Sequence, residues 1–501
     1  MDRRWLFAFL IVFTTVNCQE QTEKSTNPVT EDTDVTETAT SETVLPVATT
    51  KLPSFCTVCS CTGDDVTCDG RNLTGHFNDS QWTIKAVNVM SFTGNSLVHV
   101  KPFPEVAIAR LVLQANQITK IDDGAFMKLI NLTELDLSRN NLTADNLQPD
   151  AFQGRFSTRN YEPLAKLTRL SLAYNQLHSL HQDLFEHVPN LKVLDLSHNL
   201  FTRIDQRTLF AITSLAKLEE LNLSYCGLKD IPTTFLYSLR KLTKLDLSGN
   251  QINAPPADLG EAMSLEYLYL DENPIQIINE SSSFPAMPKL KQLSLCCMPH
   301  LTVIGKGAFG GLQSLEHVRI QNCPKLETID EYAFANETKG SEEPEWPPLK
   351  KLDLSDNALR YLPVHLVGAD WDTLEELDLM NNKWSCDCHN QYLIGVLLPK
   401  HGKRLMAEDV NKLKCSAPPE HLGKSLLSLT QKKLRCLDFY GARPERDATI
   451  LVGVLIGILI AIPICLTLFV LWRRGFFFCG SNNPASFSRA FYKRATSDDD
   501  I

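Results

Sequence analysis

The sequence lacks most of the features that catalysis and nucleic-acid binding require. Lysine and arginine number 49 against 59 aspartates and glutamates, and a net charge of −10 leaves no basic footprint for a nucleic acid. No glycine-rich phosphate-binding loop is present among the 23 glycines, and the 12 histidines are scattered without metal-ligand spacing. These absences predict a protein that is not an enzyme, holds no cofactor and binds no nucleic acid.

Apolar runs are also few, and the two longest lie near the ends of the chain. Residues 6–13 follow Arg3 and Arg4, which predicts a signal peptide over residues 1–18. Residues 19–54 are rich in Thr, Ser and Glu and cannot bury enough apolar surface to fold. We expect this segment to be a disordered stalk, either O-glycosylated or a simple linker.

The second apolar run, residues 450–472, contains no charged residue and would be about 35 Å long as a helix. That length is enough to cross a bilayer, and Arg473 and Arg474 mark the cytoplasmic side. The pattern predicts a single-pass type I protein of the plasma membrane, with a juxtamembrane linker over residues 438–449. The tail over residues 473–501 is too short for a catalytic domain.

Leucine and other aliphatic residues recur on the template L-x-x-L-x-L-x-x-N-x-L about a dozen times over residues 84–383. The unit at Leu191, for example, continues with Leu194, Leu196, Asn199 and Phe201. Units begin every 23 to 27 residues, except that the steps 132–167 and 315–349 are 35 and 34 residues and should carry loops. The repeat predicts an α/β solenoid, a leucine-rich-repeat horseshoe with a parallel sheet on its concave face.

Two further positions of the unit predict buried structure. The Asn amide should bond the backbone where the chain leaves each strand, and Cys226, Cys323 and Met298 replace it in three units. A phenylalanine late in most units should fill the convex side of the core. The Asn positions are Asn116, Asn140, Asn175, Asn199, Asn250, Asn273, Asn357 and Asn382, and the phenylalanines are Phe126, Phe152, Phe185, Phe235, Phe284, Phe309 and Phe334.

Cysteine clusters flank the repeats and predict lids for the two open ends of the solenoid, over residues 55–83 and 384–437. Clustered cysteines can also form a zinc site, but an exported chain favours disulfides. Spacing alone leaves three pairings open in each cluster. The clusters are Cys56, Cys59, Cys61 and Cys68, then Cys386, Cys388, Cys415 and Cys436.

Cap, repeats, cap, single span and short tail together resemble the leucine-rich-repeat cell-surface receptors and adhesion molecules of animals, over residues 56–472. The resemblance implies that an extracellular protein binds the concave face. It also implies a disulfide pairing for each cap. The implied disulfides are Cys56–Cys61, Cys59–Cys68, Cys386–Cys415 and Cys388–Cys436.

Residues 68–74 and 382–389 are in addition similar to the trophoblast-glycoprotein type of membrane Wnt inhibitors, although Lys383 stands where proline is usual. This similarity implies an alternative function, the regulation of a secreted-ligand pathway such as Wnt signalling. A structural surface glycoprotein without a specific ligand is a third interpretation.

Variable positions between the strand leucines are where a ligand should be sought. One stretch replaces the usual Asp and Ser with aromatic and mixed polar groups, which are enriched at protein interfaces, although each residue alone fits an ordinary surface. Aspartates form a line at the same strand positions, but aspartate is the usual residue there in leucine-rich repeats. We therefore expect these aspartates to have a structural role and not to bind a ligand. The candidate contacts are Tyr267, Tyr269, Asp271, Gln292, His317, Arg319 and Gln321, and the acidic line is Asp136, Asp195, Asp246, Asp353 and Asp378.

Seven sequons predict N-linked glycans on the outer surface, and the one at Asn222 should face out from the concave sheet. A glycan there would make partners dock to one side of it. The sequons are Asn72, Asn78, Asn131, Asn141, Asn222, Asn279 and Asn336.

Three weaker patterns complete the predictions. Cys226, Cys296, Cys297 and Cys323 lie in the repeats, where a Cys297–Cys323 bridge is geometrically possible and buried free thiols are the alternative. The tail ends with Asp499 and Ile501 in the positions that a PDZ domain reads. Small residues on one face of the span, Gly453, Gly457 and Ala461, are compatible with a homodimer.

Overall fold

The computed structural model describes residues 54–82, 84–156, 161–337, 344–368, 371–436 and 444–474. The predicted signal peptide, most of the stalk and the tail motif at Asp499 and Ile501 lie outside the described residues. The described residues comprise the capped repeats and one long C-terminal helix.

The repeats form a solenoid around one 14-stranded sheet. Within this sheet only the β1–β2 pair is antiparallel. Each repeat adds one parallel strand, whose central aliphatic residue is in register with that of the next strand. In strand order, the bounds are β1 Ser60–Thr62, β2 Asp65–Thr67, β3 Ala86–Ser91, β5 Ala107–Val112, β7 Glu134–Asp136, β10 Arg169–Ser171, β11 Val193–Asp195, β12 Glu220–Asn222, β13 Lys244–Asp246, β14 Tyr267–Tyr269, β16 Gln292–Ser294, β18 His317–Arg319, β20 Lys351–Asp353 and β21 Glu376–Asp378.

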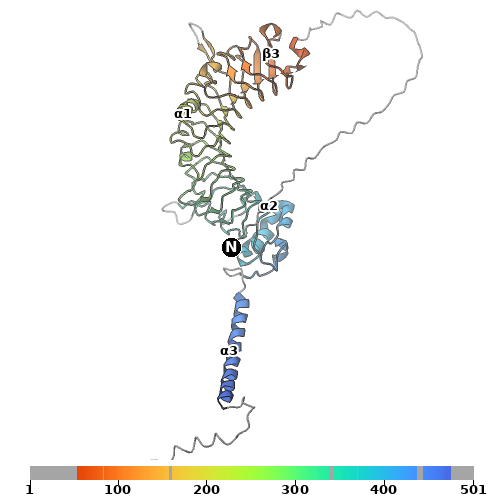
Figure 1. The fold of residues 1–501 in the computed structure, drawn as a ribbon, viewed down its shortest axis with the longest axis vertical. Helices are drawn as coiled ribbons and strands as arrows, with labels where there is room; N and C mark the ends of the chain where they lie inside the picture. Colours follow the sequence, from red (N-terminus) through yellow and green to blue (C-terminus); the bar gives the residue numbers. More distant parts are fainter. Residues whose placement is uncertain are drawn as a thin grey trace, which may run out of the picture. The chain divides into compact units, whose positions relative to one another are not determined.

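Short elements line the rest of each turn. Figure 1 shows the repeats as an arc, with helix α1, Gln206–Thr213, on its outer edge; the Asp205 side chain accepts the N–H of Thr208 and caps this helix. The remaining strands are β4 His99–Val100, β6 Lys120–Ile121, β8 Arg155–Phe156, β9 Tyr161–Glu162, β15 Ile277–Ile278, β17 Val303–Ile304 and β19 Thr328–Ile329. The 3-10 turns are η1 Ser54–Thr57, η2 Asp79–Gln81, η3 Pro149–Phe152, η4 Ala257–Glu261, η5 Cys388–Asn390, η7 Ala407–Lys412 and η8 Leu426–Leu429.

The core follows the repeat template. Within each short strand the central residue is buried and its neighbours are more exposed, so the sheet has one apolar and one solvated face. All seven phenylalanines predicted for the convex side are buried. Phe126 stacks on Phe152 and Phe309 on Phe334, with ring centroids 6.1 and 4.7 Å apart.

The predicted asparagine ladder is present in the turns after the strands. The Asn199 amide donates to the carbonyls of Leu172 and Leu196, both at 2.9 Å, and its Oδ1 accepts the N–H of Leu177 at 3.0 Å. Each ladder residue thus ties two consecutive repeats together. At the substituted position Cys226, the sulfur makes weak hydrogen bonds, to the carbonyls of Leu196 at 3.3 Å and Ser224 at 3.5 Å.

Both long repeats carry loops, as predicted. In the first, β8 and β9 pair antiparallel, and Gly154 lies so close to Glu162 that an added Cβ would stand 2.2 Å from its carbonyl oxygen. In the second, Asn336 and Glu345 form an antiparallel bridge. The described ends of each insertion therefore run antiparallel to each other, a pattern that repeat spacing alone does not predict.

Lids close both ends of the solenoid. The β1–β2 hairpin covers the first end, and its second strand pairs with β3. At the other end, the π-helical segment η6, Leu393–Gly402, continues into α2, Lys403–Met406, which contacts the last strand β21. The structure pairs Cys56 with Cys61, Cys59 with Cys68, Cys386 with Cys415 and Cys388 with Cys436, the same pairs that the family resemblance implies.

Two cysteine positions in the repeats differ from expectation. Cys297 is bonded to Cys296, so the bridge to Cys323 that strand spacing allowed is wrong. Cys226 and Cys323 are buried free thiols, and burial raises their pKa values to about 12 and about 11. Both thiols therefore stay protonated and act as core residues.

Helix α3, Pro444–Arg473, contains the predicted span but begins six residues before it. Proline suits the first position of a helix because its φ is already fixed and no N–H is needed there. Within this helix, Ala448–Arg473 is long and apolar enough to cross a membrane, and it is the one such segment among the described residues. Gly453 and Gly457 on the predicted dimer face have open space around them.

A partly buried histidine in the first cap predicts acid sensitivity. His76 stacks on Phe103 with ring centroids 4.4 Å apart, and burial lowers the pKa of His76 below its usual value. Between that lowered pKa and about pH 6.5, His76 binds a proton in the unfolded chain but not in the folded chain. The free energy of unfolding therefore falls as the pH drops through this window. Denaturant midpoints measured from pH 7.5 to 5 should show this loss. His76→Gln should flatten the profile and His178→Gln, at an exposed position, should leave it unchanged.

Candidate functional site

The solvated face of the sheet forms two hollows, as expected for the concave side of a solenoid. The first hollow lies over β7, β10, β11, β12 and β13 and the second over β16, β18, β20 and β21. Each hollow is lined mainly by the residues that flank the central aliphatic residue of its strands, although Ser294 of β16 is buried. Strand β14 lies between the two groups of strands, so its tyrosines divide the face.

The structure brings together all seven candidate contacts, which we call the central patch. β14, β16 and β18 are neighbours in the sheet, and Tyr267, Gln292 and His317 lie in one register column. Tyr269 and Arg319 share a second register column, with Ser294 between them. Asp271 and Gln321 follow the strands in the turns at their carboxyl ends. The central patch therefore includes three residues that line the second hollow, Gln292, His317 and Arg319, and extends from them to the tyrosines of β14.

Contacts within the central patch are polar and partly exposed. Tyr267 retains 37% of its accessible surface, and the Gln292 amide lies 3.5 Å from the Tyr269 hydroxyl. Lys244 lies 5.9 Å from the centroid of the Tyr269 ring. Arg319, which is exposed, pairs with Asp353 on the next strand at 3.9 Å. Large rings with polar edges and an exposed guanidinium are the groups most often found at the energetic centre of protein interfaces.

Asp271 has a structural role within the central patch. Its Oδ1 accepts the N–H of Cys296 at 2.7 Å. Burial raises the pKa of Asp271, and the negative charge of Asp246 acts in the same direction. The carboxylate therefore anchors the turn that carries the Cys296–Cys297 disulfide, which places this disulfide at the rim of the central patch.

The acidic line has the structural role that its sequence context predicts. Asp136, Asp195 and Asp246 each accept the N–H of the residue two positions later, at 2.9 to 3.0 Å. Asp353 and Asp378 do the same in the second hollow. One carboxylate oxygen of each is thus used to hold the turn after its strand, and the charge remains on the concave face.

None of the seven sequon asparagines is buried. Asn222 lies on β12 in the first hollow, and its Oδ1 accepts the N–H of Ser224 at 3.0 Å. Asn131 and Asn141 belong to the turns on either side of β7. The prediction that a glycan at Asn222 would sit on the concave face thus agrees with the position of its side chain.

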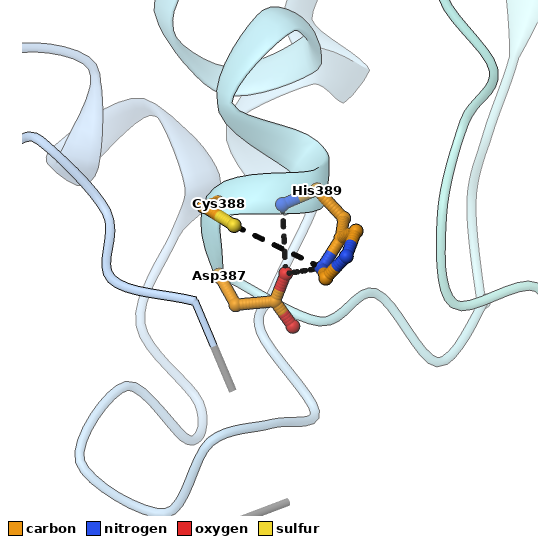
Figure 2. Close-up of side chains that lie close together, drawn as sticks. All are labelled: Asp387, Cys388 and His389. Atoms are coloured by element: carbon orange, nitrogen blue, oxygen red, sulfur yellow. Dashed lines mark hydrogen bonds and ion pairs between the residues drawn. The ribbon is translucent and has the colours of Figure 1, made fainter. Parts of the chain in front are cut away.

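One group of side chains in the described part of the chain has the spacing of a metal site, namely Asp387, Cys388 and His389 (Figure 2). The sulfur of Cys388 is bonded to Cys436, so it offers no thiolate. Asp387 is fully buried, and its Oδ1 accepts the His389 N–H at 2.9 Å and lies 3.0 Å from Nδ1 of the same residue. Its Oδ2 accepts the Tyr361 hydroxyl at 3.1 Å. This chemistry fits a capped turn in a disulfide-closed lid and does not fit a metal centre.

A family model described as leucine rich repeat matches residues 107–155, 165–219 and 216–275. The chain is a leucine-rich-repeat protein. Podocan-like protein 1 of Mus musculus is 32% identical over 240 residues, which are 47% of this chain and 39% of the relative. Transforming growth factor beta activator LRRC32 of Pongo abelii is 30% identical over 397 residues, 67% of this chain and 59% of the relative. Keratocan of Gallus gallus is 32% identical over 205 residues, 40% of this chain and 52% of the relative.

The leucine-rich-repeat chain thus spans 39 to 59% of the length of these relatives. Among solved structures, the mouse RP105/MD-1 complex is similar with a TM-score of 0.49 and 21% identity, over 70% of this chain and 58% of that chain. Human 5T4, trophoblast glycoprotein, gives a TM-score of 0.33 and 21% identity, over 76% and 98%.

Proposed function

We propose that this leucine-rich-repeat protein is a cell-surface glycoprotein that binds an extracellular protein through the central patch, as a receptor or an adhesion molecule. The observation that carries the proposal is the convergence of Tyr267, Tyr269, Gln292 and Arg319 on three neighbouring strands of an open concave face. Repeats of this kind stack into curved surfaces that commonly serve as binding sites.

Placement at the plasma membrane is part of the proposal. The apolar segment Ala448–Arg473 would anchor the chain, and the basic Arg473 and Arg474 favour a cytoplasmic tail. Five disulfides among the described residues and seven accessible sequons suit an oxidising extracellular environment. A PDZ partner at Asp499 and Ile501 and a homodimer through Gly453, Gly457 and Ala461 stay predictions of the sequence.

Charge reversal of Arg319 tests the site. In full-length protein on cells, Arg319→Glu should weaken binding of a soluble partner, found by screening extracellular proteins, by about tenfold or more, since buried Arg contacts at interface centres carry about 2 kcal/mol. Arg169→Glu is the matched control, because Arg169 is equally a strand residue of the concave face but belongs to the first hollow. Equal loss in both variants would mean that overall charge, and not the central patch, governs binding.

A second candidate function is the regulation of a secreted ligand in the same membrane. It is supported by the similarity to a transforming growth factor beta activator, which extends over 67% of this chain. The trophoblast-glycoprotein resemblance would instead point to Wnt ligands. Aggregation of expressing cells favours adhesion, whereas altered Wnt or growth-factor reporter output without aggregation favours the regulator. If neither occurs and Arg319→Glu changes no binding, the results favour a structural surface glycoprotein without a specific ligand.

A further inference from the structure

A stack of planar side chains lies beside the first hollow, outside the central patch. Tyr174, His198 and Tyr225 come from three consecutive repeats, and their rings are nearly parallel, with centroids 3.9 and 4.4 Å apart. The Arg139 guanidinium continues the series, 4.0 Å from the centroid of the Tyr174 ring. We call these four residues the aromatic stack. Both tyrosines retain 39% of their accessible surface.

The aromatic stack lies in the turns that follow the strands of the first hollow. Its members each lie three positions after a residue that lines the hollow, as Tyr174 follows Ser171 and His198 follows Asp195. The charges of Asp195 and Arg139 both act on the pKa of His198, which burial lowers. Since every member of the stack follows a lining residue by three positions, the stack runs along one edge of the first hollow.

The backbone at the aromatic stack is unfavourable for large side chains. Tyr174, His198 and Tyr225 all have φ between 53° and 55°, and Gly249 occupies the same position in the next repeat. A left-handed conformation is unfavourable for an L-residue, and the stacking of each pair of rings offsets part of that cost. Glycine would satisfy the turn without this penalty. Other repeats place Arg139, Glu272 or Asn322 at the same position, so the turn does not require aromatic residues. The run of rings in three consecutive repeats instead gives this edge two exposed tyrosines that a partner can contact.

Charge on the first hollow indicates the chemistry of that partner. Five carboxylates line it, against the two cations Arg169 and Lys244. Asp136, Asp195 and Asp246 share one register column, in which they alternate with Ser171 and Asn222. Neighbouring aspartates of the column are two strands apart, which is about 9.6 Å. A polyproline II segment repeats every three residues, or about 9.3 Å, and proline-rich segments dock against aromatic-lined grooves.

We propose that the first hollow and the aromatic stack bind a basic polyproline II segment of an extracellular protein, with a lysine or arginine at every third position. Its cationic side chains pair with Asp136, Asp195 and Asp246, and its proline rings lie against the exposed edges of Tyr174 and Tyr225. This site goes beyond the proposed function, which places its partner on the central patch. The sequon at Asn222 lies within the same column, so its glycan decides how much of the column a segment can reach.

The test uses the full-length protein in nanodiscs and a fluorescein-labelled peptide of repeated Pro-Pro-Lys as the probe. Fluorescence anisotropy should show binding that weakens with added salt, because the contacts are ionic. A peptide of the same composition with its lysines grouped at one end should bind about tenfold more weakly. Asp195→Asn and Tyr174→Ala should each weaken binding by about tenfold, a loss of about 1.4 kcal/mol. Asp353→Asn, which has the same backbone hydrogen bond but lies in the second hollow, should bind normally.

Several outcomes would overturn this inference. Equal affinity for the grouped-lysine peptide would show that charge alone attracts the probe. If the peptide binds the Asn222→Gln variant and not the unsubstituted protein, a glycan at Asn222 closes the site. If Tyr174→Ala changes self-association and not peptide affinity, a second copy of the chain occupies the stack instead. Arg319→Glu should leave peptide affinity unchanged, so failure of the central patch as a binding site can be told apart from failure of this one.

Discussion

Replacing Cys388 and Cys436 together with alanine is expected to lower the free energy of unfolding by about 4 kcal/mol. This disulfide closes a loop with a sequence separation of 48 residues, and the entropy that a crosslink removes from the unfolded chain grows with the logarithm of loop length. The same bond holds η5 against the end of the last lid, beside the buried Asp387. Its loss should therefore open the lid that covers β21. Denaturant unfolding of the full-length protein in detergent, followed by tryptophan fluorescence, measures the change.

The matched control is the pair Cys56 and Cys61 in the first lid. Their sequence separation is only 5, so their replacement by alanine should cost about 2 kcal/mol. Trp384, which is buried beside the C-terminal lid, reports mainly on the first variant. An equal cost for both double variants would contradict the view that loop closure is what these disulfides contribute. Unchanged stability in the Cys388 variant would mean that the lid does not need its bond.

The second large effect is expected at the asparagine ladder, where Asn250→Ala should cost about 3–5 kcal/mol. The Asn250 Oδ1 accepts the N–H groups of Cys226 and Leu228 at 3.1 and 2.9 Å. Its Nδ2 donates to the carbonyls of Leu223 and Leu247 at 2.9 and 2.8 Å. Alanine leaves these buried backbone groups without partners, and each orphaned group costs about 1–3 kcal/mol, although the losses do not add fully. The change should appear as a lower denaturant midpoint.

Cys226→Ala provides the control, because Cys226 holds the ladder position of the preceding repeat. Burial raises the pKa of Cys226 to about 12, so its thiol stays protonated and makes weak hydrogen bonds, to the carbonyls of Leu196 and Ser224, where an amide would make strong ones. Its removal should cost only about 1 kcal/mol. If Cys226→Ala and Asn250→Ala are equally destabilising, the ladder contributes through packing and not through its hydrogen bonds.

Periodic features of this protein could be predicted from its sequence because each one recurs in every repeat. The buried leucines, the phenylalanines of the convex side and the asparagine ladder all follow from position within the unit. The central patch could also be located, because parallel strands in register bring Tyr267, Gln292 and His317 side by side. Cap disulfides required more than spacing, since four cysteines allow three pairings and only the family resemblance selected one.

Features outside the periodic template were missed. The aromatic stack lies in the turns, where no rule of alternation applies, yet an alignment of the units would have shown Tyr174, His198 and Tyr225 one position before the ladder residue. The Cys296–Cys297 bond was not predicted, because strand spacing offered only a possible Cys297–Cys323 bridge, with buried free thiols as the alternative. Helix α3 begins outside the apolar run because Pro444 sets its start, whereas hydropathy marks only the segment that suits a bilayer.

Site-specific photo-crosslinking on living cells tests the central claim most directly. A photoreactive amino acid replaces Gln292 in the central patch or, as the control, Phe210, an exposed residue of α1 on the outer edge of the arc (Figure 1). Irradiation should link an extracellular protein to position 292 and not to position 210. Crosslinks from position 210 alone, or equal crosslinks from both positions, would contradict binding through the concave face.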